Sequence, residues 1–352
     1  MMSRPNTPST LPRYLALAYG LLVIYASLHP FSGWRSTGAS PFAYLNAAWP
    51  RYWTVFDLAV NVAGYLPLGF LLALALKQLP TRALPALAAW VMGTALSFAM
   101  ESIQTWLPSR VPSNLDLATN SLGTALGALI AFFYGEPLFR SLTHWQGRLV
   151  ADRPHAEPGV VLLGLWLLTQ VTPETLLFGA GDVRHLVGLP SDQPFAPQVF
   201  QVVEAAIVGI NLVAVGLFAR TLLADRWPAL VGVPLLIVTA LGVRSLATAV
   251  LVGPDDAFAW FTPGSRLGLE WGAAALLVLV WLPADMRISL ASLGLMAATV
   301  LINLAPENPY SAAALAAWRQ GHFFNFNGVT RITASLWPFA AVPYLMLVAR
   351  RI

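Results

Sequence analysis

The sequence predicts an all-α fold, a bundle of helices that cross a membrane about ten times. Hydrophobic residues make up 57% of the 352 residues, charged residues only 10%, and the mean hydropathy is +0.66. Because soluble domains carry about 25% charged residues, this composition excludes a water-soluble enzyme and a nucleic-acid-binding protein. The net charge of +4 does not alter that conclusion, since the Lys and Arg residues stand singly at the ends of apolar segments.

Ten apolar segments are each long enough to cross a bilayer, which requires roughly 20 residues of helix. In chain order they are residues 13–30, 57–76, 84–107, 117–134, 159–178, 198–223, 229–251, 266–283, 286–304 and 333–349. They divide into a four-helix membrane unit at 1–135, a linker at 136–158, a second four-helix unit at 159–284, and two C-terminal spans at 285–352.

The basic residues indicate that both ends of the chain face the cytoplasm. With this orientation most of the 20 Lys and Arg residues lie in cytoplasmic segments, as the positive-inside rule requires. We therefore expect an integral, multi-pass protein of the cytoplasmic (inner) membrane in which the linker 136–158 is cytoplasmic. The loops that follow odd-numbered spans then face outward.

The second unit is expected to be a diverged copy of the first. When the chain is shifted against itself, Asp57 falls over Glu204, Gly69 falls over Gly216, and the first four spans fall over the fifth to eighth. Units with an even number of spans would be parallel repeats, and the last two spans would then be an addition. The alternative is a chance alignment, because any two sets of apolar helices align somewhere.

Polar side chains enter the second, third and fourth spans at helical spacing. Asp57 and Asn61 are four residues apart and share one helix face, and Glu101 follows Ser97 by the same step. In the proposed orientation these groups lie at the outer ends of their helices, and Arg110 lies in the loop between the third and fourth spans. We expect them to converge on one pocket in the outer leaflet. The candidate ligand-binding residues are Asp57, Asn61, Glu101, Gln104, Arg110, Asp116 and Asn120.

Two interpretations of this pocket are open. Charged groups at the membrane centre cost on the order of 2.5 to 3.5 kcal/mol each, so they need either partners or a function. In the structural interpretation, Arg110 pairs with Glu101 or Asp116 and locks the helices together. In the functional interpretation, the pocket binds the polar head of an amphiphile, which also accounts for the uncharged Asn and Gln side chains.

Three motifs carry a resemblance to a known family: the run from Asp57 to Phe70, the segment from Glu101 to Gln104 with Arg110, and the run from Asp116 to Gly123. In these motifs the chain resembles the VanZ-like family, over residues 15–135. The resemblance implies an integral membrane protein of the cell envelope, tied to glycopeptide resistance or surface-polymer phenotypes. The positions that look like the characteristic ones of the family are Asn61, Pro67, Gly69, Glu101, Gln104, Arg110, Asp116, Asn120 and Gly123.

The rest of the chain offers weaker signals. In the second unit, Glu204, Arg244 and Glu270 are expected near outer helix ends, where Arg244 either belongs to a diverged site or pairs with one of the carboxylates. The aromatic segment 41–53 is expected to anchor at the membrane interface. The last outer loop, 311–328, is interpreted either as another interfacial anchor or as a lid, and Asn325 and Asn327 would decide between them.

The leading function is binding or handling of an outer-leaflet amphiphile, such as a lipid-linked sugar, a peptidoglycan precursor or a lipoglycopeptide. The first alternative is a membrane enzyme that acts on a lipid-linked substrate, with Glu101 or Asp116 as acid or base and Arg110 as an anion clamp. The second is a transporter or flippase. A divalent cation held by Asp57, Glu101 and Asp116 is disfavoured by the nearby Arg110. The chain has no Cys, and we expect no cofactor, no metal and no nucleic-acid partner.

Overall fold

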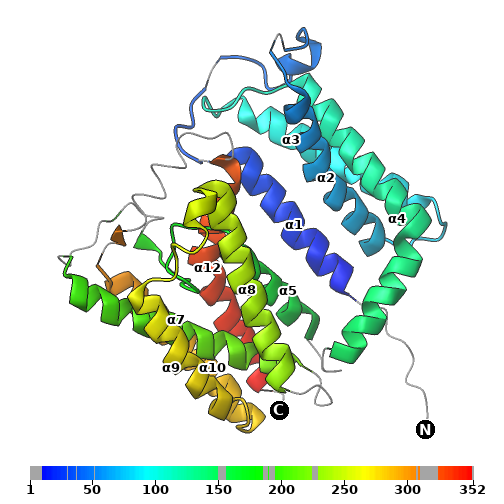
Figure 1. Cartoon of the computed structure of the whole chain (residues 1–352). Coiled ribbons are helices and arrows are strands. Elements are labelled where there is room, and N and C mark those ends of the chain that lie inside the picture. The colour runs from blue at the N-terminus through cyan, green and yellow to red at the C-terminus, as the bar shows by residue number, and fades with distance from the viewer. Residues whose placement is uncertain are drawn as a thin grey trace, which may run out of the picture. The chain divides into compact units, whose positions relative to one another are not determined.

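A computed structural model describes residues 10–29, 31–36, 38–50, 52–149, 156–184, 189, 195–223, 229–306, 308–309 and 324–350. Within these ranges the regular elements are helices, and eight of them are long and apolar enough to cross a membrane. The predicted all-α membrane bundle is therefore confirmed (Figure 1).

The helices correspond in order to the predicted spans. They are α1 (Leu11–Leu28), α2 (Val55–Ala75), α3 (Leu84–Gln104), α4 (Asn114–Leu149), α5 (Ala156–Thr169), α7 (Pro197–Leu222), α8 (Ala229–Leu251), α9 (Pro263–Leu279), α10 (Ala284–Leu304) and α12 (Phe324–Ala349). Two short 3-10 helices, η1 (Ala43–Asn46) and η2 (Pro254–Asp256), lie in the loops after α1 and α8.

Helix α5 is shorter than the expected fifth span. It ends at Thr169 after 14 residues, whereas the apolar segment continues to residue 178. The dipeptide Thr172-Pro173 follows the helix, and the residue before a proline is disfavoured in the α region. At 1.5 Å per residue α5 is about 21 Å long, which is less than the bilayer hydrocarbon thickness of about 30 Å. The residues that follow α5 therefore form a loop.

Helix α4 is longer than the expected fourth span, because it has 36 residues and continues to Leu149. Much of the segment expected to be a linker, 136–158, is thus helical. The chain divides into two compact units, residues 1–146 and 147–352.

In the first unit, α1 packs against α2 and α3, and α2 packs against α3. Helix α4 approaches α2 very closely. A Cβ atom added at Gly69 would overlap the backbone of Thr124, and one added at Gly123 would overlap the backbone of Val62. Small residues therefore let the two backbones touch, as they do at many helix contacts within membranes.

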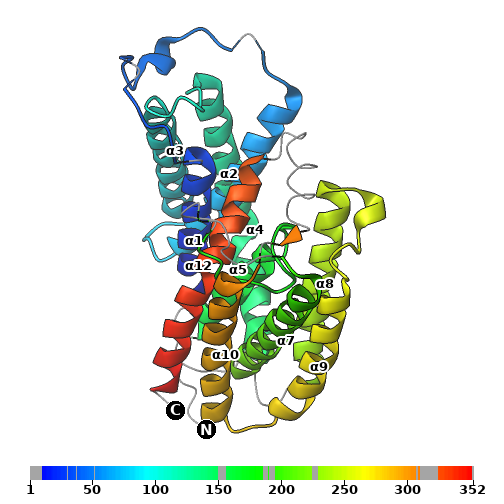
Figure 2. The same ribbon diagram turned by 90° about the vertical axis from the view of Figure 1, so that its left-hand side faces the viewer.

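In the second unit, α7 is the central helix, with 72% of its apolar stretch buried. It packs along α9 and α10, and α12 packs against α10 and α5 (Figures 1 and 2). Glycines again allow close approach, since Gly209 faces the ring of Trp271 and Gly268 faces the backbone of Ala205. The two C-terminal helices α10 and α12 thus belong to the same compact unit as α5 to α9.

Apolar side chains cover the outer surface of the helices. On α8, Leu235, Val238 and Leu246 are each more than 60% exposed, and on α1 Leu17 and Leu21 are each more than 55% exposed. Large exposed apolar surfaces of this kind mark interaction sites, and on a helix of membrane-spanning length they are the surface that faces lipid chains.

The aromatic segment 41–53 is largely on the surface. Trp49, Tyr52 and Trp53 are exposed and Tyr44 is buried, so the role of the exposed rings as an interfacial anchor stays a prediction. Residues 311–323 of the second aromatic loop, 311–328, are not among the residues that the structure describes. The side chains of Asn325 and Asn327 are not described either. The choice between anchor and lid therefore also stays a prediction.

Candidate functional site

The candidate residues lie where α2 begins, α3 ends and α4 begins, with Arg110 in the loop 105–113. At the start of α2, the carboxylate of Asp57 accepts hydrogen bonds from the Thr54 amide at 3.0 Å and from the Thr54 hydroxyl at 2.7 Å. The Asp57 amide donates in return to the Thr54 hydroxyl, which completes a capping box. Asp57 is exposed, and its observed role is to start the helix.

Asn61 and Asp116 join α2 to α4. The side-chain amide of Asn61 donates to Oδ1 of Asp116 at 3.0 Å and to the hydroxyl of Thr119 at 3.4 Å. The Thr119 hydroxyl donates in turn to the carbonyl oxygen of Leu115 at 2.9 Å. The expected meeting of the second and fourth spans through polar side chains is thus present as a hydrogen-bonded pair.

Glu101 is 4% exposed and joins α3 to the start of α4. Its Oε2 accepts a hydrogen bond from the backbone amide of Ser113 at 2.8 Å. The hydroxyl of Ser113 caps α4 by accepting from the amides of Leu115 and Asp116. Because burying a carboxylate without a hydrogen-bond donor is costly, this amide is an essential partner of Glu101.

Arg110 and Gln104 hold the end of α1. The guanidinium of Arg110 donates to the carbonyl oxygens of Ala26 at 3.1 Å and of His29 at 2.9 and 3.1 Å. The side-chain amide of Gln104 donates to the carbonyl oxygen of Ser27 at 3.0 Å. A cation at the C-terminal end of a helix is stabilised by the helix dipole. Burial lowers the pKa of Arg110 and the Glu101 carboxylate opposes that change, so the guanidinium keeps its charge.

The expected partner of Arg110 therefore needs correction. In the structural interpretation Arg110 pairs with Glu101 or Asp116, whereas the hydrogen bonds described for its guanidinium go to the carbonyl oxygens of Ala26 and His29 at the end of α1. Glu101 accepts from a backbone amide and Asp116 accepts from Asn61. The described hydrogen bonds of the polar cluster thus go to backbone groups and to a neutral amide.

Beneath this layer lies a buried group of neutral side chains. The side-chain amide of Asn120 donates to the hydroxyl of Ser97 at 3.0 Å, and Asn120 and Ser97 are 6% and 0% exposed. The hydroxyl of Tyr65, a residue that is 6% exposed, lies near Ser97 and the Glu101 carboxylate. Among the described residues, neither Oδ1 of Asn120 nor Oη of Tyr65 has a hydrogen-bond partner. One acceptor and one donor are therefore left over in the interior of the first unit.

The structure thus adds Tyr65 and Ser113 to the predicted set. Tyr65 follows Asn61 by four residues, so the spacing that singled out Asn61 also places Tyr65 on the same helix face. Ser113 contributes its backbone amide and its capping hydroxyl. The only sequence signal for this role is its position directly before the Asn-Leu-Asp start of a helix.

A metal site does not form from the carboxylates considered above. In the part of the chain that the structure describes, no three His, Cys, Asp or Glu side chains gather closely enough to hold an ion. Asp57 is engaged at its capping box, Glu101 at Ser113 and Asp116 at Asn61.

In the second unit the expected charge pairs are also rearranged. The hydroxyl of Thr262 donates to Glu204 at 2.7 Å, and Arg244 donates to carbonyl oxygens of the loop that follows α5. Glu270 pairs with Arg266 on the same helix at 2.8 Å, on the surface. Arg244 therefore does not pair with Glu204 or Glu270 as one alternative proposed, because its partners are backbone carbonyl groups.

A comparison with known protein families finds a match within the first unit. The family model described as VanZ/LLP1 matches residues 7–135. This range contains all seven candidate ligand-binding residues, and it confirms the resemblance to the VanZ-like family in this part of the chain. No curated protein and no solved structure matches the chain.

Proposed function

We propose that this integral membrane protein, whose residues 7–135 match the VanZ/LLP1 family model, binds the polar head of an amphiphile in the outer leaflet of the cell envelope. The ligand class is a lipid-linked sugar, a peptidoglycan precursor or a lipoglycopeptide. These molecules carry hydroxyl and amide groups on an apolar anchor, which matches a polar cluster between membrane helices. The same proposal includes the inner-membrane location, the outward orientation of the cluster and a role in glycopeptide resistance.

The observation that carries the proposal is the pair of unsatisfied polar atoms in the buried cluster. Oδ1 of Asn120 can accept a hydrogen bond and the hydroxyl of Tyr65 can donate one, and both atoms are buried without a partner in the described part of the chain. Leaving such a group unpaired costs about 1 to 3 kcal/mol, so a partner supplied by a ligand would be favourable at both atoms. A hydroxyl or amide of a ligand headgroup would pair with both atoms, beside the carboxylate of Glu101.

The surrounding contacts support a preorganised site. Glu101 and Ser97 of α3 are each bonded to α4 or its cap, since the Ser113 amide donates to Glu101 and Asn120 donates to Ser97. Arg110 and Gln104 tie the end of α1 to the same region. A site whose side chains are already fixed loses little entropy when a ligand binds.

A membrane enzyme is the second candidate function. It would use Glu101 or Asp116 as acid or base, and Glu101 favours it because a buried carboxylate beside polar groups is a common arrangement in catalytic sites. Arg110 supports it less, because its guanidinium contacts carbonyl oxygens in place of an anion site. A transporter or flippase would in addition need a polar path to the other end of the helices.

The experiment is mass spectrometry of amphiphiles that co-purify with the full-length protein. We expect an intact headgroup-bearing amphiphile to be enriched on the wild type and lost from Asn120→Ala and from Tyr65→Phe. The matched control is Gln78→Ala, an exposed side chain at the opposite end of α2 that bonds only Arg13 among the described residues. Equal enrichment on the wild type and both variants would overturn the proposal. A chemically altered product that accumulates with time on the wild type, and not on Glu101→Gln, would favour the enzyme.

A further inference from the structure

A buried arginine of α8 fixes the start of the loop that follows α5. Arg244 is 3% exposed, and its two Nη atoms donate to the hydroxyl of Thr175 and to the carbonyl oxygens of Thr172, Pro173 and Thr175. Carbonyl groups of a loop inside a membrane protein need such donors, because little water is available to pair with them. Nε of Arg244 is left without a hydrogen-bond partner among the described residues, and no carboxylate among them forms an ion pair with this guanidinium.

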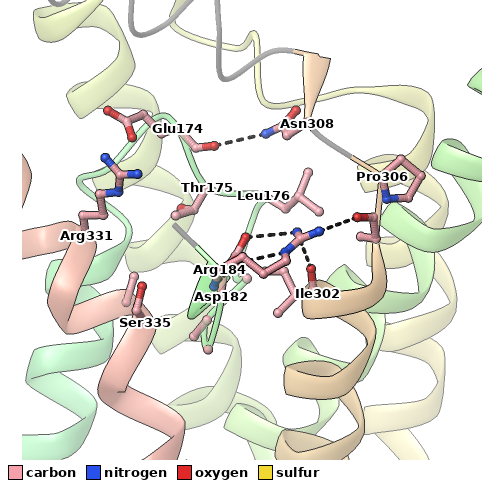
Figure 3. A pocket seen from close by; sticks show the side chains of 15 residues that line it. Glu174, Thr175, Leu176, Asp182, Arg184, Ile302, Pro306, Asn308, Arg331 and Ser335 are labelled. Carbon is pink, nitrogen blue, oxygen red and sulfur yellow. Dashed lines mark hydrogen bonds and ion pairs between the residues drawn. The ribbon is translucent and has the colours of Figure 1, made fainter. Parts of the chain in front are cut away.

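The end of the same loop is fixed by α10 and α12. Arg184 donates to the carbonyl oxygens of Ile302 and Ala305, each at 2.7 Å (Figure 3). The backbone amide of Gly181 donates to the carbonyl oxygen of Ala334 on α12 at 2.8 Å. The loop is therefore held at both ends and can form one wall of a binding site.

This loop, the end of α8 and the connection from α8 to α9 surround a cavity of about 360 Å³ that is partly open. Its apolar walls include Leu176 and Leu177 of the loop and Val252 after α8. Small-molecule sites measure about 300 to 1,000 Å³, so the cavity has room for a ligand of one ring. The polar side chains that line it decide the chemistry of that ligand.

Glu204 of α7 supplies a buried carboxylate to this cavity. Its Oε1 accepts a hydrogen bond from the hydroxyl of Thr262 at 2.7 Å, and its Oε2 lies against Gly264, where an added Cβ atom would overlap it. Thr262 also caps α9 by accepting from the amide of Ser265, so the carboxylate lies at the N-terminal end of a helix, where the dipole favours a negative charge. No described residue donates a hydrogen bond to Oε2. Glu204 is therefore a fixed carboxylate with one oxygen still able to accept.

Trp260 and Asp256, in the connection from α8 to α9, complete the lining. The indole nitrogen of Trp260 donates to the hydroxyl of Ser245 at 2.9 Å, which fixes the orientation of the ring. Asp256 is exposed and also lines the cavity, so its carboxylate lies where the cavity opens. The cavity thus combines an aromatic ring with two carboxylates and the guanidinium of Arg244.

The charges at this cavity favour a neutral ligand with several hydroxyl groups. A phosphate or carboxylate binds a guanidinium best through two N–H groups, but in the described part of the chain Arg244 has only Nε left, and an anion would also face Glu204 and Asp256. An ammonium group would face the charge of Arg244. A hydroxyl group meets both kinds of neighbour, because it donates to a carboxylate and accepts from an N–H group.

We propose that this cavity of the second unit binds a neutral pyranose sugar ring. The hydroxyl groups of the ring donate to Oε2 of Glu204 and to Asp256 at the opening, and one of them accepts from Nε of Arg244. The C–H face of the ring lies on the indole of Trp260, since the face of an aromatic ring carries partial negative charge and attracts polarised C–H groups. This site does not rest on the polar cluster of the first unit.

The experiment measures binding of methyl β-glucopyranoside and methyl β-galactopyranoside to the full-length protein in phospholipid nanodiscs, by saturation-transfer NMR. We expect saturable binding of at least one of these glycosides. Tetrahydropyran-2-methanol has the ring with a single hydroxyl group, and it should bind about tenfold more weakly because it lacks the other hydrogen bonds. Absence of saturable binding by both glycosides overturns the proposal. Tighter binding of glucosamine or glucuronate, which carry a charge, overturns the neutral class of ligand.

Three side chains are tested by substitution. Glu204→Gln keeps an acceptor for Thr262 and removes the charge, so it should lower the affinity for the bound glycoside about tenfold, the difference between a charged and a neutral hydrogen bond. Trp260→Leu should lower this affinity about tenfold, and Trp260→Phe, which keeps an aromatic face, should recover part of the loss. Asp256→Asn should have a smaller effect, because Asp256 is exposed and salt screens its charge.

Exposed residues of the same types in this unit provide matched controls. They do not line the cavity, and their variants should bind the glycoside as the wild type does: Glu270→Gln, Trp281→Leu and Asp255→Asn. Wild-type affinity in both Glu204→Gln and Trp260→Leu, with the protein still folded, overturns the proposal.

A free sugar and the sugar headgroup of a lipid share this chemistry, and the matching octyl glycoside distinguishes them. If its affinity, corrected for partition into empty nanodiscs, exceeds that of the methyl glycoside, the site takes the headgroup of a glycolipid. Equal affinities assign the site to a free sugar.

The test is independent of the first site, because Asn120→Ala and Tyr65→Phe should bind the methyl glycosides as the wild type does. Loss of the co-purifying amphiphile from Asn120→Ala with normal glycoside binding would support both proposals. Equal loss of glycoside binding in Asn120→Ala and Glu204→Gln would overturn the separation of the two sites.

Discussion

Asn61 of α2 donates a hydrogen bond to the carboxylate of Asp116 of α4 at 3.0 Å, and so joins two helices that are separated along the chain by the whole of α3. The same two helices touch through glycine a short distance away, where Gly123 faces the backbone of Val62. The polar pair and the glycine contact thus belong to one interface, in which close backbone approach places short polar side chains within bonding distance.

Replacing Asn61 with Leu should destabilise the protein modestly. The substitution removes the donor to Asp116 while keeping an apolar side chain of similar volume, and hydrogen bonds between membrane helices contribute about 0.6 kcal/mol on average and at most about 1.7. We therefore expect the midpoint of thermal unfolding in detergent to fall by a few degrees. Asn61→Asp combined with Asp116→Asn restores a donor and an acceptor and should recover the loss. An unfolding midpoint equal to the wild type in Asn61→Leu would show that this bond does not stabilise the interface.

Two glycines of α2 should respond oppositely to alanine. A Cβ atom at Gly69 would overlap the backbone of Thr124, whereas one at Gly64 meets nothing within 4 Å. Overpacking a close contact typically costs about 1 to 3 kcal/mol, while replacing a helical glycine by alanine in open space gains up to about 1 kcal/mol. Gly69→Ala should therefore lower the unfolding midpoint and Gly64→Ala should leave it unchanged or raise it. Equal effects of the two substitutions would contradict the close approach of α2 and α4.

The sequence predicts the helices well and the partners of the polar side chains less well. Length and hydropathy predicted ten crossing helices, and eight of the described helices are long and apolar enough to cross a membrane, while α5 and α9 are shorter. Helix α5 ends early because Thr172-Pro173 follows it, and a hydropathy profile does not take the effect of proline on the backbone into account. One interpretation paired Arg110 with a carboxylate, but its described hydrogen bonds go to the backbone carbonyl groups of Ala26 and His29. Residue types cannot predict such partners, because every residue carries a carbonyl group.

Spacing predicted which polar side chains share a helix face, and it did not predict which of their atoms lack a hydrogen-bond partner. Helical periodicity brings Asn61, Glu101 and Asn120 toward one region, since residues four apart share a helix face. Which atoms remain without a partner depends on rotamers and on helix approach, and these follow from packing of the whole unit. Spacing places Tyr65 on the same helix face as Asn61, but the buried hydroxyl of Tyr65 without a partner among the described residues is visible only in the structure.

Removing the side chain of Arg110 should loosen the end of α1. Its guanidinium makes hydrogen bonds to two carbonyl groups, and hydrogen bonds to charged groups contribute about 1.5 to 3 kcal/mol. Arg110→Ala should lower the unfolding midpoint more than Asn61→Leu does, and it should increase amide hydrogen exchange of the last turn of α1. Arg110→Lys keeps the charge with fewer donors in a different geometry, so its effect should be intermediate. If hydrogen exchange at the last turn of α1 is unaffected in Arg110→Ala, Arg110 does not hold that helix.

The orientation of the first unit can be measured directly because the chain contains no cysteine, so a single introduced thiol is labelled without background. Val111 is 83% exposed in the loop beside the polar cluster, and Gln78 is exposed beyond the opposite end of α2. The excess of basic residues in the segments assigned to the cytoplasm predicts that Val111→Cys reacts with a membrane-impermeant maleimide on intact cells. Gln78→Cys should react only after the membrane is permeabilised. The opposite pattern would place the cluster of Tyr65, Glu101 and Asn120 at the cytoplasmic end of the helices, and a ligand in the outer leaflet would then have no access to it.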